Sequence, residues 1–312
     1  MKPILYVARP LPGGALAPLE ALFEVRTGDG PLRAGAVPDA ARGATTLVVT
    51  YLDRVDAALL GAFPALRHLA SYGVGVNHID LAECRRRNIL VTNTPGILTD
   101  ATADHAMALL LAAARRIAEG DRVIRAGGWT SSAPGWMLGT EVTRKTLGIV
   151  GFGRIGQAVA RRAAGFEMKV LYTGPREVPF PGARRLPLEA LLAESDFVSL
   201  HVPLTPDTEH LLSAERIARM KPGAILVNTA RGPVVDDAAL AGALGSGRLA
   251  AAGLDVFPRE PAVPEAYLAL PNVVLTPHLG SGTRETRAAM ARMVLEEVAR
   301  VARGEPARHP VA

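Results

Sequence analysis

Apolar and polar positions follow two recurring patterns along this chain. Short runs rich in valine, isoleucine and leucine predict buried strands, and the longer amphipathic segments between them predict helices. In the first third, the expected strands are residues 4–8, 22–26, 46–50, 68–71 and 90–92. Helices are expected near residues 55–61 and 79–87. This alternation of strand and helix favours an α/β protein with parallel sheets.

The same alternation resumes after one long helix, expected from about residue 99 to 125, and an irregular segment at 127–143. The strands expected beyond it are residues 147–150, 169–172, 197–201, 224–228, 251–254 and 273–276. A last helix at 284–302 is expected to cross back to the first part of the chain. The predicted fold class is therefore α/β, with two Rossmann-like or flavodoxin-like domains and a cleft between them.

The segment Leu-Gly-Ile-Val-Gly-Phe-Gly-Arg-Ile-Gly at 147–156 carries the motif G-x-G-x-x-G between a strand and a helix. Gly151 permits the tight turn, Gly153 lets a pyrophosphate approach the backbone, and Gly156 lets the helix pack on its strand. The N–H groups at the start of the helix would face the phosphates. A plain glycine-rich turn has the same pattern, but the strand before it and the helix and strand after it favour dinucleotide binding.

Together these patterns assign a role to each of two domains. A discontinuous substrate-binding domain is expected at residues 1–98 plus 285–312, and a dinucleotide-binding Rossmann domain at 99–284. A length of 312 residues suits two domains.

Composition narrows the class of protein. The net charge is +5, but the basic residues are scattered over helical patterns without interleaved aromatics, which argues against a nucleic-acid partner. Cys84 is the only cysteine, so a disulfide within the chain and a thiolate zinc site are excluded. The N-terminal apolar run is too short for a signal peptide, and Arg115 interrupts the most apolar helix. We expect a cytoplasmic protein with no membrane span and no metal.

Three polar side chains follow strands of the second domain, at the sheet edge where α/β proteins bind ligands. Arg231 offers a planar guanidinium to a carboxylate or keto oxygen. His278 can donate a proton to a carbonyl oxygen as hydride reaches the carbon, and accept it in reverse. Glu260 could bond the other ring nitrogen and favour the imidazolium. Singly they could be a surface arginine, a rim carboxylate and a loop histidine; beside a dinucleotide motif they favour reduction of a 2-keto acid.

With these motifs the chain resembles the D-isomer-specific 2-hydroxyacid dehydrogenase family. The matching segments are GFGRIG at 151–156, HVPLT at 201–205, NTARG at 228–232, GLDVF at 253–257 with Glu260-Pro261, TPHLG at 276–280, GVGVNHID at 73–80 and NTP at 93–95. The resemblance implies two similar α/β domains, NAD(P)-dependent hydride transfer and a homodimer.

The resemblance also implies roles for individual residues. Arg231 would orient the substrate, Glu260 would partner the histidine, and His278 would be the acid/base. The backbone N–H groups of Val74 and Gly75 would hold the substrate carboxylate, an amide nest in physical terms. Residues implied to bind the cofactor, beside the three glycines of the motif, are Arg154, Ile155, Pro203, Thr229, Asp255 (toward the nicotinamide carboxamide), His278 and Gly280.

The end of the second strand of the Rossmann domain bears on cofactor choice. An NAD-specific site has a carboxylate there for the ribose 2′-hydroxyl. This chain has Thr173 and Arg176 instead, which suit a 2′-phosphate, so we predict preference for NADP(H). NAD(H) stays open, because a shifted loop would bring Glu177 to the ribose. The pattern is similar to the glyoxylate/hydroxypyruvate reductase branch of the family.

Two apolar side chains are candidates for shaping the substrate pocket. Leu52 follows a strand of the first domain and would cap the pocket. Trp136 lies in the irregular segment, and similar segments of relatives reach the neighbouring subunit's cleft. Trp136 therefore either shapes that pocket or only packs at the interface. His105 in the long helix is interpreted as a core or interface histidine, and His201 as structural.

The function predicted is an NAD(P)-dependent oxidoreductase that interconverts small 2-keto acids and D-2-hydroxy acids, an NADPH-preferring glyoxylate/hydroxypyruvate reductase. One alternative is an NAD-dependent dehydrogenase for another acid, of the phosphoglycerate, phosphite or D-lactate type. The other is a dinucleotide-sensing, corepressor-like binding protein. Turnover of 2-keto acids separates the enzymes from the binding protein.

Overall fold

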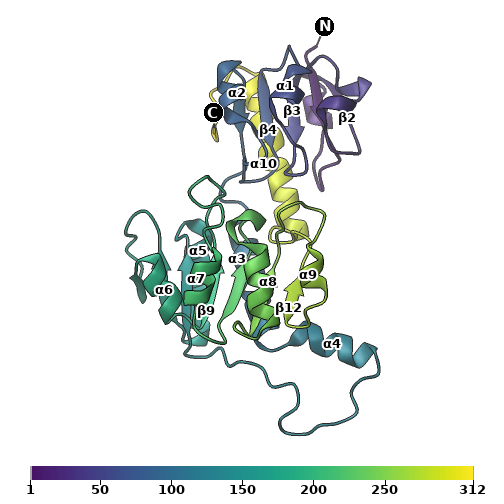
Figure 1. The fold of residues 1–312 in the computed structure, drawn as a ribbon. Coiled ribbons are helices and arrows are strands. Elements are labelled where there is room, and N and C mark those ends of the chain that lie inside the picture. The colour runs from purple at the N-terminus through teal and green to yellow at the C-terminus, as the bar shows by residue number, and fades with distance from the viewer. Residues whose placement is uncertain (1, 312) are drawn as a thin grey trace. The chain divides into compact units, whose positions relative to one another are not determined.

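The computed structural model describes residues 2–311 and divides the chain into two compact units (Figure 1). The first unit takes the chain up to Leu98 and again from Gly282 onward, and the second unit is Thr99–Ser281. The second boundary lies three residues before the position predicted from the sequence.

The first unit contains a five-stranded parallel sheet. Its strands are β1 (Ile4–Val7), β2 (Glu24–Thr27), β3 (Ala44–Val49), β4 (His68–Ser71) and β5 (Leu90–Thr92). Their order is β2-β1-β3-β4-β5, which is the flavodoxin-like order. The bounds of β4 and β5 are those predicted.

Helices cover both faces of this sheet, as a parallel sheet requires. One face packs on α1 (Ala57–Gly61) and α2 (Leu81–Arg86), and the other packs on α10 (Arg284–Ala302). Successive strand residues point to opposite faces, so Leu47 joins the first core and Val48 the second. Three short 3-10 helices complete the unit: η1 (Ala17–Leu19), η2 (Ala34–Ala36) and η3 (Asp39–Ala41).

The second unit contains a seven-stranded parallel sheet. Its strands are β6 (Thr146–Val150), β7 (Lys169–Thr173), β8 (Ala183–Arg185), β9 (Phe197–Leu200), β10 (Ile225–Asn228), β11 (Ala251–Leu254) and β12 (Val273–Leu275). The order β12-β11-β10-β9-β6-β7-β8 is that of a Rossmann fold with one added strand. Both sheets confirm the predicted α/β class. The sequence analysis missed β8, because this edge strand is short and ends in two arginines.

Two helical layers enclose the second sheet (Figure 1). One layer holds α3 (Thr99–Ala114) and α5 (Arg154–Ala163), followed by η4 (Ala164–Phe166). The other holds α6 (Leu188–Glu194), α7 (Ala214–Arg219), α8 (Asp237–Gly245) and α9 (Glu265–Leu268), with η5 (Gly232–Val234) leading into α8.

The prediction of one long helix over residues 99–125 is wrong. Helix α3 ends at Ala114, and α4 (Ile117–Arg125) begins after Arg116, which has a left-handed φ of 53°. The returning chain places the Thr140 N–H on the Ala114 carbonyl at 2.7 Å, so this carbonyl is satisfied without another helical turn. Helix α4 has no buried residue, and with the loop after it projects away from the sheet of its unit (Figure 1).

Candidate active site

The glycine motif forms the turn from β6 into α5. Gly151 has φ +95°, and a Cβ there would lie 2.6 Å from the His201 carbonyl oxygen. A Cβ on Gly156 would lie 2.3 Å from the Gly151 carbonyl oxygen, so this glycine lets the helix start close to its strand. Both positions require glycine, because a Cβ at either would clash with the backbone of the same unit.

Gly153 differs from these two glycines. A Cβ there would have no atom within 4 Å, and the residue is the N-cap of α5 with no side-chain cap. Helix α5 begins at Arg154 and Ile155, and no side chain caps the backbone N–H groups of its first turn, beside the open space at Gly153. A pyrophosphate fits this cradle, because the helix N-terminus offers donors and a partial positive charge to an anion.

Neighbouring strand ends contribute further groups at the same edge of the sheet. Thr229 follows β10, and its Oγ1 is buried without a hydrogen-bond partner among residues 2–311. A buried hydroxyl of this kind fits a ligand's polar group. Pro203 follows β9, where its carbonyl accepts from Thr208 Oγ1 at 2.6 Å. The donors and the open space both fit a dinucleotide.

The loop after β10 presents Arg231. The Asn228 side chain shapes this loop by accepting from the Ala230 N–H and donating to the Arg231 carbonyl, both at 3.0 Å. The Arg231 guanidinium donates from Nη1 to the Ala230 carbonyl at 2.6 Å and is half-buried. A fixed backbone thus carries a cation at the edge of the sheet where ligands bind.

Glu260 and His278 form a hydrogen-bonded pair. Glu260 Oε2 lies 2.7 Å from His278 Nδ1, and Oε1 accepts from the Phe257 N–H at 3.0 Å. Both carboxylate oxygens are therefore held, and Nδ1 is the nitrogen that carries the shared proton. This is the contact that the sequence analysis expected between the carboxylate and the histidine.

Gly232 brings the loops after β10 and β11 together. A Cβ at Gly232 would lie 2.1 Å from the Phe257 carbonyl carbon and 2.4 Å from Pro258 N. Only glycine allows this close approach of two backbones. The loop of Arg231 is thereby packed against the loop of Glu260, and Glu260 in turn bonds His278 in the loop after β12.

Asp255 is almost fully buried, at 1% exposure, and organises the loop of His278. Its carboxylate accepts from Thr276 Oγ1 (2.7 Å), Leu279 N–H (2.6 Å) and Gly280 N–H (2.8 Å). Burial raises the pKa of Asp255, but hydrogen bonds from His105, Thr276 and Leu279 outweigh it, so the net pKa is lowered. Asp255, which is predicted to face the nicotinamide, thus also accepts the hydrogen bonds that hold the loop of His278.

His105 is the residue whose position sequence reasoning did not connect to this site. It lies in α3, and its Nε2 is 3.2 Å from Asp255 Oδ1 and 3.0 Å from Thr276 Oγ1. The contacts span 150 and 171 residues of sequence, so no local pattern indicates them. His201, expected to be structural, bonds Ser199 Oγ at 2.8 Å, and burial lowers its pKa to about 4.

The loop after β7 holds the groups expected near the ribose. Thr173 ends β7, and Arg176 is exposed two residues beyond Gly174. Arg185 Nη2 donates to the Gly174 carbonyl at 2.8 Å, which places a second cation beside this loop. The hollow of about 870 Å³ at this position is lined by Thr173, Glu177, Arg184 and Arg185 among others.

The remaining predicted residues lie on separate loops. Leu52 follows β3 and is partly exposed, and Val74 and Gly75 follow β4, where Asn93 Nδ2 donates to the Val74 carbonyl at 2.8 Å. Trp136 lies between α4 and β6 and is 41% exposed. These positions leave the roles of the four residues as proposals.

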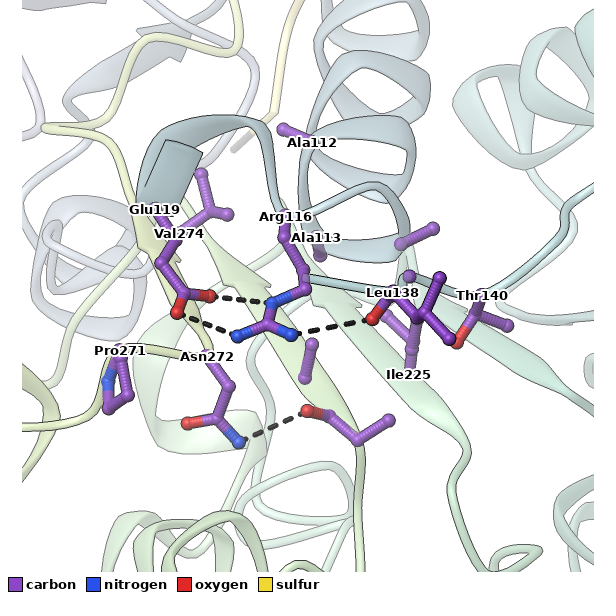
Figure 2. A pocket seen from close by; sticks show the side chains of 14 residues that line it. Ala112, Ala113, Arg116, Glu119, Leu138, Thr140, Ile225, Pro271, Asn272 and Val274 are labelled. Atoms are coloured by element: carbon purple, nitrogen blue, oxygen red, sulfur yellow. Dashed lines mark hydrogen bonds and ion pairs between the residues drawn. The ribbon is translucent and has the colours of Figure 1, made fainter. Parts of the chain in front are cut away.

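A second cavity of about 240 Å³ lies at the opposite edge of the same sheet, where β10 and β11 begin (Figure 2). Arg116 dominates it: its guanidinium bonds both Glu119 oxygens (2.7 and 2.8 Å) and reaches the Leu138 carbonyl (3.4 Å). The walls are mainly alanine, isoleucine and valine side chains. The hydrogen bonds of Arg116 to Glu119 and Leu138 join the two ends of the 117–140 segment.

Two further features are absent from residues 2–311. No group of three or more histidine, cysteine, aspartate or glutamate side chains there is arranged to hold a metal ion. No helix in the same range is long and apolar enough to cross a membrane.

Comparison with known proteins gives close matches over the whole chain. The family model for the NAD binding domain of D-isomer specific 2-hydroxyacid dehydrogenases matches residues 107–280. A glyoxylate reductase from Thermococcus litoralis is 47% identical over 315 residues, which is 98% of this chain and 95% of the relative.

Two solved structures have nearly the same fold. A protein from Thermus thermophilus matches with a TM-score of 0.91 and 47% identity, covering 99% of this chain and 100% of that chain. An NADPH-dependent glyoxylate/hydroxypyruvate reductase from Sinorhizobium meliloti, in complex with NADP and malonate, matches with a TM-score of 0.91 and 34% identity. That match covers 100% of this chain and 97% of the other.

Proposed function

The chain belongs to the D-isomer-specific 2-hydroxyacid dehydrogenase family, and we propose that it is a glyoxylate/hydroxypyruvate reductase that prefers NADP(H). The single observation that carries the proposal is the His278–Glu260 pair, at the same sheet edge as an open glycine cradle. Groups for acid/base chemistry and for dinucleotide binding thereby follow strands of one sheet, β11 and β12 for the pair and β6 for the cradle, at the edge where α/β sheets bind ligands.

A bound nicotinamide would supply hydride to C2 of the keto acid. The histidine supplies the proton: Glu260 holds Nδ1, so Nε2 is the nitrogen that donates to the carbonyl oxygen. In the reverse direction the same nitrogen accepts the proton of the hydroxy acid. The Phe257 N–H keeps the carboxylate from rotating, so the ring orientation is set before substrate binds.

We assign substrate orientation to charge and backbone groups. The Arg231 guanidinium polarises the keto oxygen or pairs with the carboxylate. The Val74 and Gly75 amides hold the carboxylate in a nest, and Leu52 limits the size of the C3 substituent. Asp255 and Gly280 face the nicotinamide end, and Thr229 bonds the dinucleotide through its buried hydroxyl.

The reductase assignment is tested by turnover. We expect the purified protein to oxidise NADPH with glyoxylate and hydroxypyruvate, and His278→Asn to lower kcat by about 10²- to 10⁴-fold. His210→Asn, at an exposed histidine of the same unit, is the matched control and keeps full activity. Turnover only with D-lactate-type or phosphorylated acids would reassign the substrate, and no turnover with dinucleotide still bound would favour a sensing protein.

We propose NADP(H) preference from the charges at the end of β7. Thr173 offers a hydroxyl and Arg176 a cation, and Arg185 adds a second cation by its bond to Gly174. Glu177 is the one carboxylate among the residues that line this hollow, and it would compete for the ribose. Two cations against one carboxylate favour a 2′-phosphate.

Binding of 2′,5′-ADP and 5′-AMP, measured by calorimetry, tests this preference without turnover. We expect tighter binding of 2′,5′-ADP than of 5′-AMP. Arg176→Ala removes a cation from the 2′-phosphate and should weaken binding of 2′,5′-ADP alone by about tenfold, or about 1.4 kcal/mol. Arg184→Ala is the matched control, because Arg184 is already paired with Glu194 at 2.7 Å. Equal affinity for both ligands would support NAD(H).

We also propose a homodimer that forms through residues 117–140. This segment carries large exposed apolar side chains, among them Ile124 at 60%, Trp129 at 59% and Leu138 at 68%. An apolar surface of this kind marks an association site.

The buried single cysteine suits a reducing compartment, and we place the enzyme in the cytoplasm.

Light scattering after size exclusion tests the dimer. Leu138→Glu should give a monomer, and Leu268→Glu, at an equally exposed leucine of α9, should leave the dimer intact. A Leu138→Glu variant that stays dimeric would show that the interface lies elsewhere.

A rise in KM with Trp136→Ala would support a role for Trp136 in the substrate pocket, and an unchanged KM would limit Trp136 to the interface.

A further inference from the structure

The loop that carries His278 has an unusual backbone. His278 adopts φ +54°, in the left-handed region that only a few per cent of non-glycine residues occupy. Such a conformation is strained and persists only where surrounding contacts hold it. The acid/base residue of the proposed reaction therefore depends on groups that fix its backbone.

Asp255 supplies that hold from both its main chain and its side chain. Its carbonyl accepts from the His278 N–H at 2.9 Å. Its two carboxylate oxygens accept from the next two N–H groups, those of Leu279 and Gly280. A Cβ at Gly280 would lie 3.2 Å from Asp255 Oδ2, so little space is left for the loop to shift.

The far side of the Asp255 carboxylate is held by two side chains. Thr276 Oγ1 donates to Oδ1 at 2.7 Å, so this hydroxyl proton is used there. The Thr276 oxygen is then an acceptor for His105 Nε2 at 3.0 Å, and Nε2 also lies 3.2 Å from Asp255 Oδ1. One N–H on His105 Nε2 satisfies both contacts, which fixes the ring tautomer.

His105 differs from the other members of this network in where it comes from. Asp255 and Thr276 lie at the ends of β11 and β12, whereas His105 lies in the middle of α3. Helix α3 is buried along most of its length and packs on the sheet. His105 is therefore the link from a rigid helix to the loop of His278.

We propose that His105 is a positioning residue for the reaction: by holding Asp255 and Thr276 from α3, it fixes the 276–280 loop and the orientation of the His278 imidazole. The inference rests on the proposed function for its catalytic consequence, but its structural half stands alone. His105 bonds Asp255 and Thr276 and acts through them. Its loss changes the geometry at the reacting atoms, where shifts of about 1 Å lower rates by up to about 10²-fold.

Two substitutions separate the hydrogen bond from the shape of the ring. His105→Phe keeps a planar ring and removes the donor, and His105→Gln restores an N–H donor at a comparable reach. Asp104→Asn is the matched control, because Asp104 is the neighbouring residue of α3 and pairs with Arg162 at the surface, at 2.6 Å. Thermal unfolding of each variant reports whether the fold is kept.

We expect His105→Phe to lower kcat for glyoxylate by about 10- to 100-fold, with a smaller change in KM and in dinucleotide Kd. His105→Gln should recover most of kcat, and Asp104→Asn should match the wild type. Hydrogen exchange of the Leu279 and Gly280 amides should accelerate about tenfold or more in His105→Phe and be restored in His105→Gln.

The exchange measurement needs no substrate, so it separates this inference from the reductase assignment. Unchanged exchange at Leu279 and Gly280 in His105→Phe would overturn the proposal, as would a kcat loss that His105→Gln does not repair. If the protein reduced no keto acid but the amides still lost protection, the holding role would stand and the reductase assignment would fail. Should His105→Phe fail to fold, His105→Asn, which shortens the donor, carries the same test.

Discussion

In each unit the first strand along the chain, β1 or β6, is followed by a turn that contains glycine, and the two glycines serve different purposes. After β1, Gly13 has φ +68°, and a Cβ there would lie 2.8 Å from Ala288 Cβ on α10. After β6, Gly153 would carry its Cβ into open space. One glycine permits close packing of a helix from the far end of the chain, and the other leaves room for a ligand.

The element that follows each turn accounts for the difference. In the second unit α5 starts directly at Arg154, so its ten residues present a helix N-terminus to the space beside Gly153. In the first unit the next helical element is η1, a 3-10 helix of three residues. A sheet of parallel strands therefore does not by itself create an anion site; a helix must begin where the backbone is left uncovered.

The sharpest test of this contrast is Gly153→Ala. The added methyl group meets no protein atom, so we expect an unchanged unfolding midpoint. It would occupy the space of a pyrophosphate and weaken NADPH binding by about 100-fold, or about 3 kcal/mol. Fluorescence titration measures the affinity. If this variant bound NADPH with wild-type affinity, the pyrophosphate would not bind beside Gly153.

The counterpart in the first unit is Gly13→Ala, and its effect should fall on stability alone. A left-handed φ and the contact with Ala288 together should lower the free energy of unfolding by about 2 kcal/mol. Gly30→Ala in the same unit, with no atom within 4 Å, is the control and should change stability little. Urea denaturation reports the difference. If Gly13→Ala instead weakened dinucleotide binding, the two turns would not have separate roles.

A smaller effect concerns the response of the first unit to acid. His68 in β4 is 2% exposed, bonds Thr92 Oγ1 through Nε2, and has its pKa lowered by burial from 6.5 to about 4. The unfolded chain takes up a proton below pH 6.5, whereas the folded unit does so only near pH 4. Stability is therefore full above pH 6.5 and falls as the pH drops, by roughly 1 to 2 kcal/mol between pH 6.5 and 5.

Denaturation of His68→Gln across that range should show a flatter pH dependence than the wild type, whatever its stability at neutral pH. An equal slope in both proteins would show that His68 does not set the acid response of the first unit. His201 in the second unit also has its pKa lowered by burial to about 4, so it would contribute to the slope that remains.

Local pattern was sufficient for much of the fold. The predicted bounds of β4, β5, β11 and α10 match the structure, because strand runs and helical periodicity are properties of short stretches of sequence. The glycine motif was readable for the same reason, since its three positions and flanking elements lie within one short segment. The end of α3 at Ala114 was not readable, because Thr140, far downstream in the chain, satisfies that carbonyl.

The sequence by itself determined the α/β class, the two parallel sheets and the identity of the groups that can do chemistry. Periodicity and residue type are local properties. The chemistry that a side chain can perform follows from its residue type, as it does for Arg231, Glu260 and His278. Only the tertiary structure decided which of these groups meet. The close approach at Gly232, the 2.7 Å bond of Glu260 to His278 and the reach of His105 to Asp255 all join distant segments. Such contacts depend on how strands and helices stack, which no short stretch of sequence records.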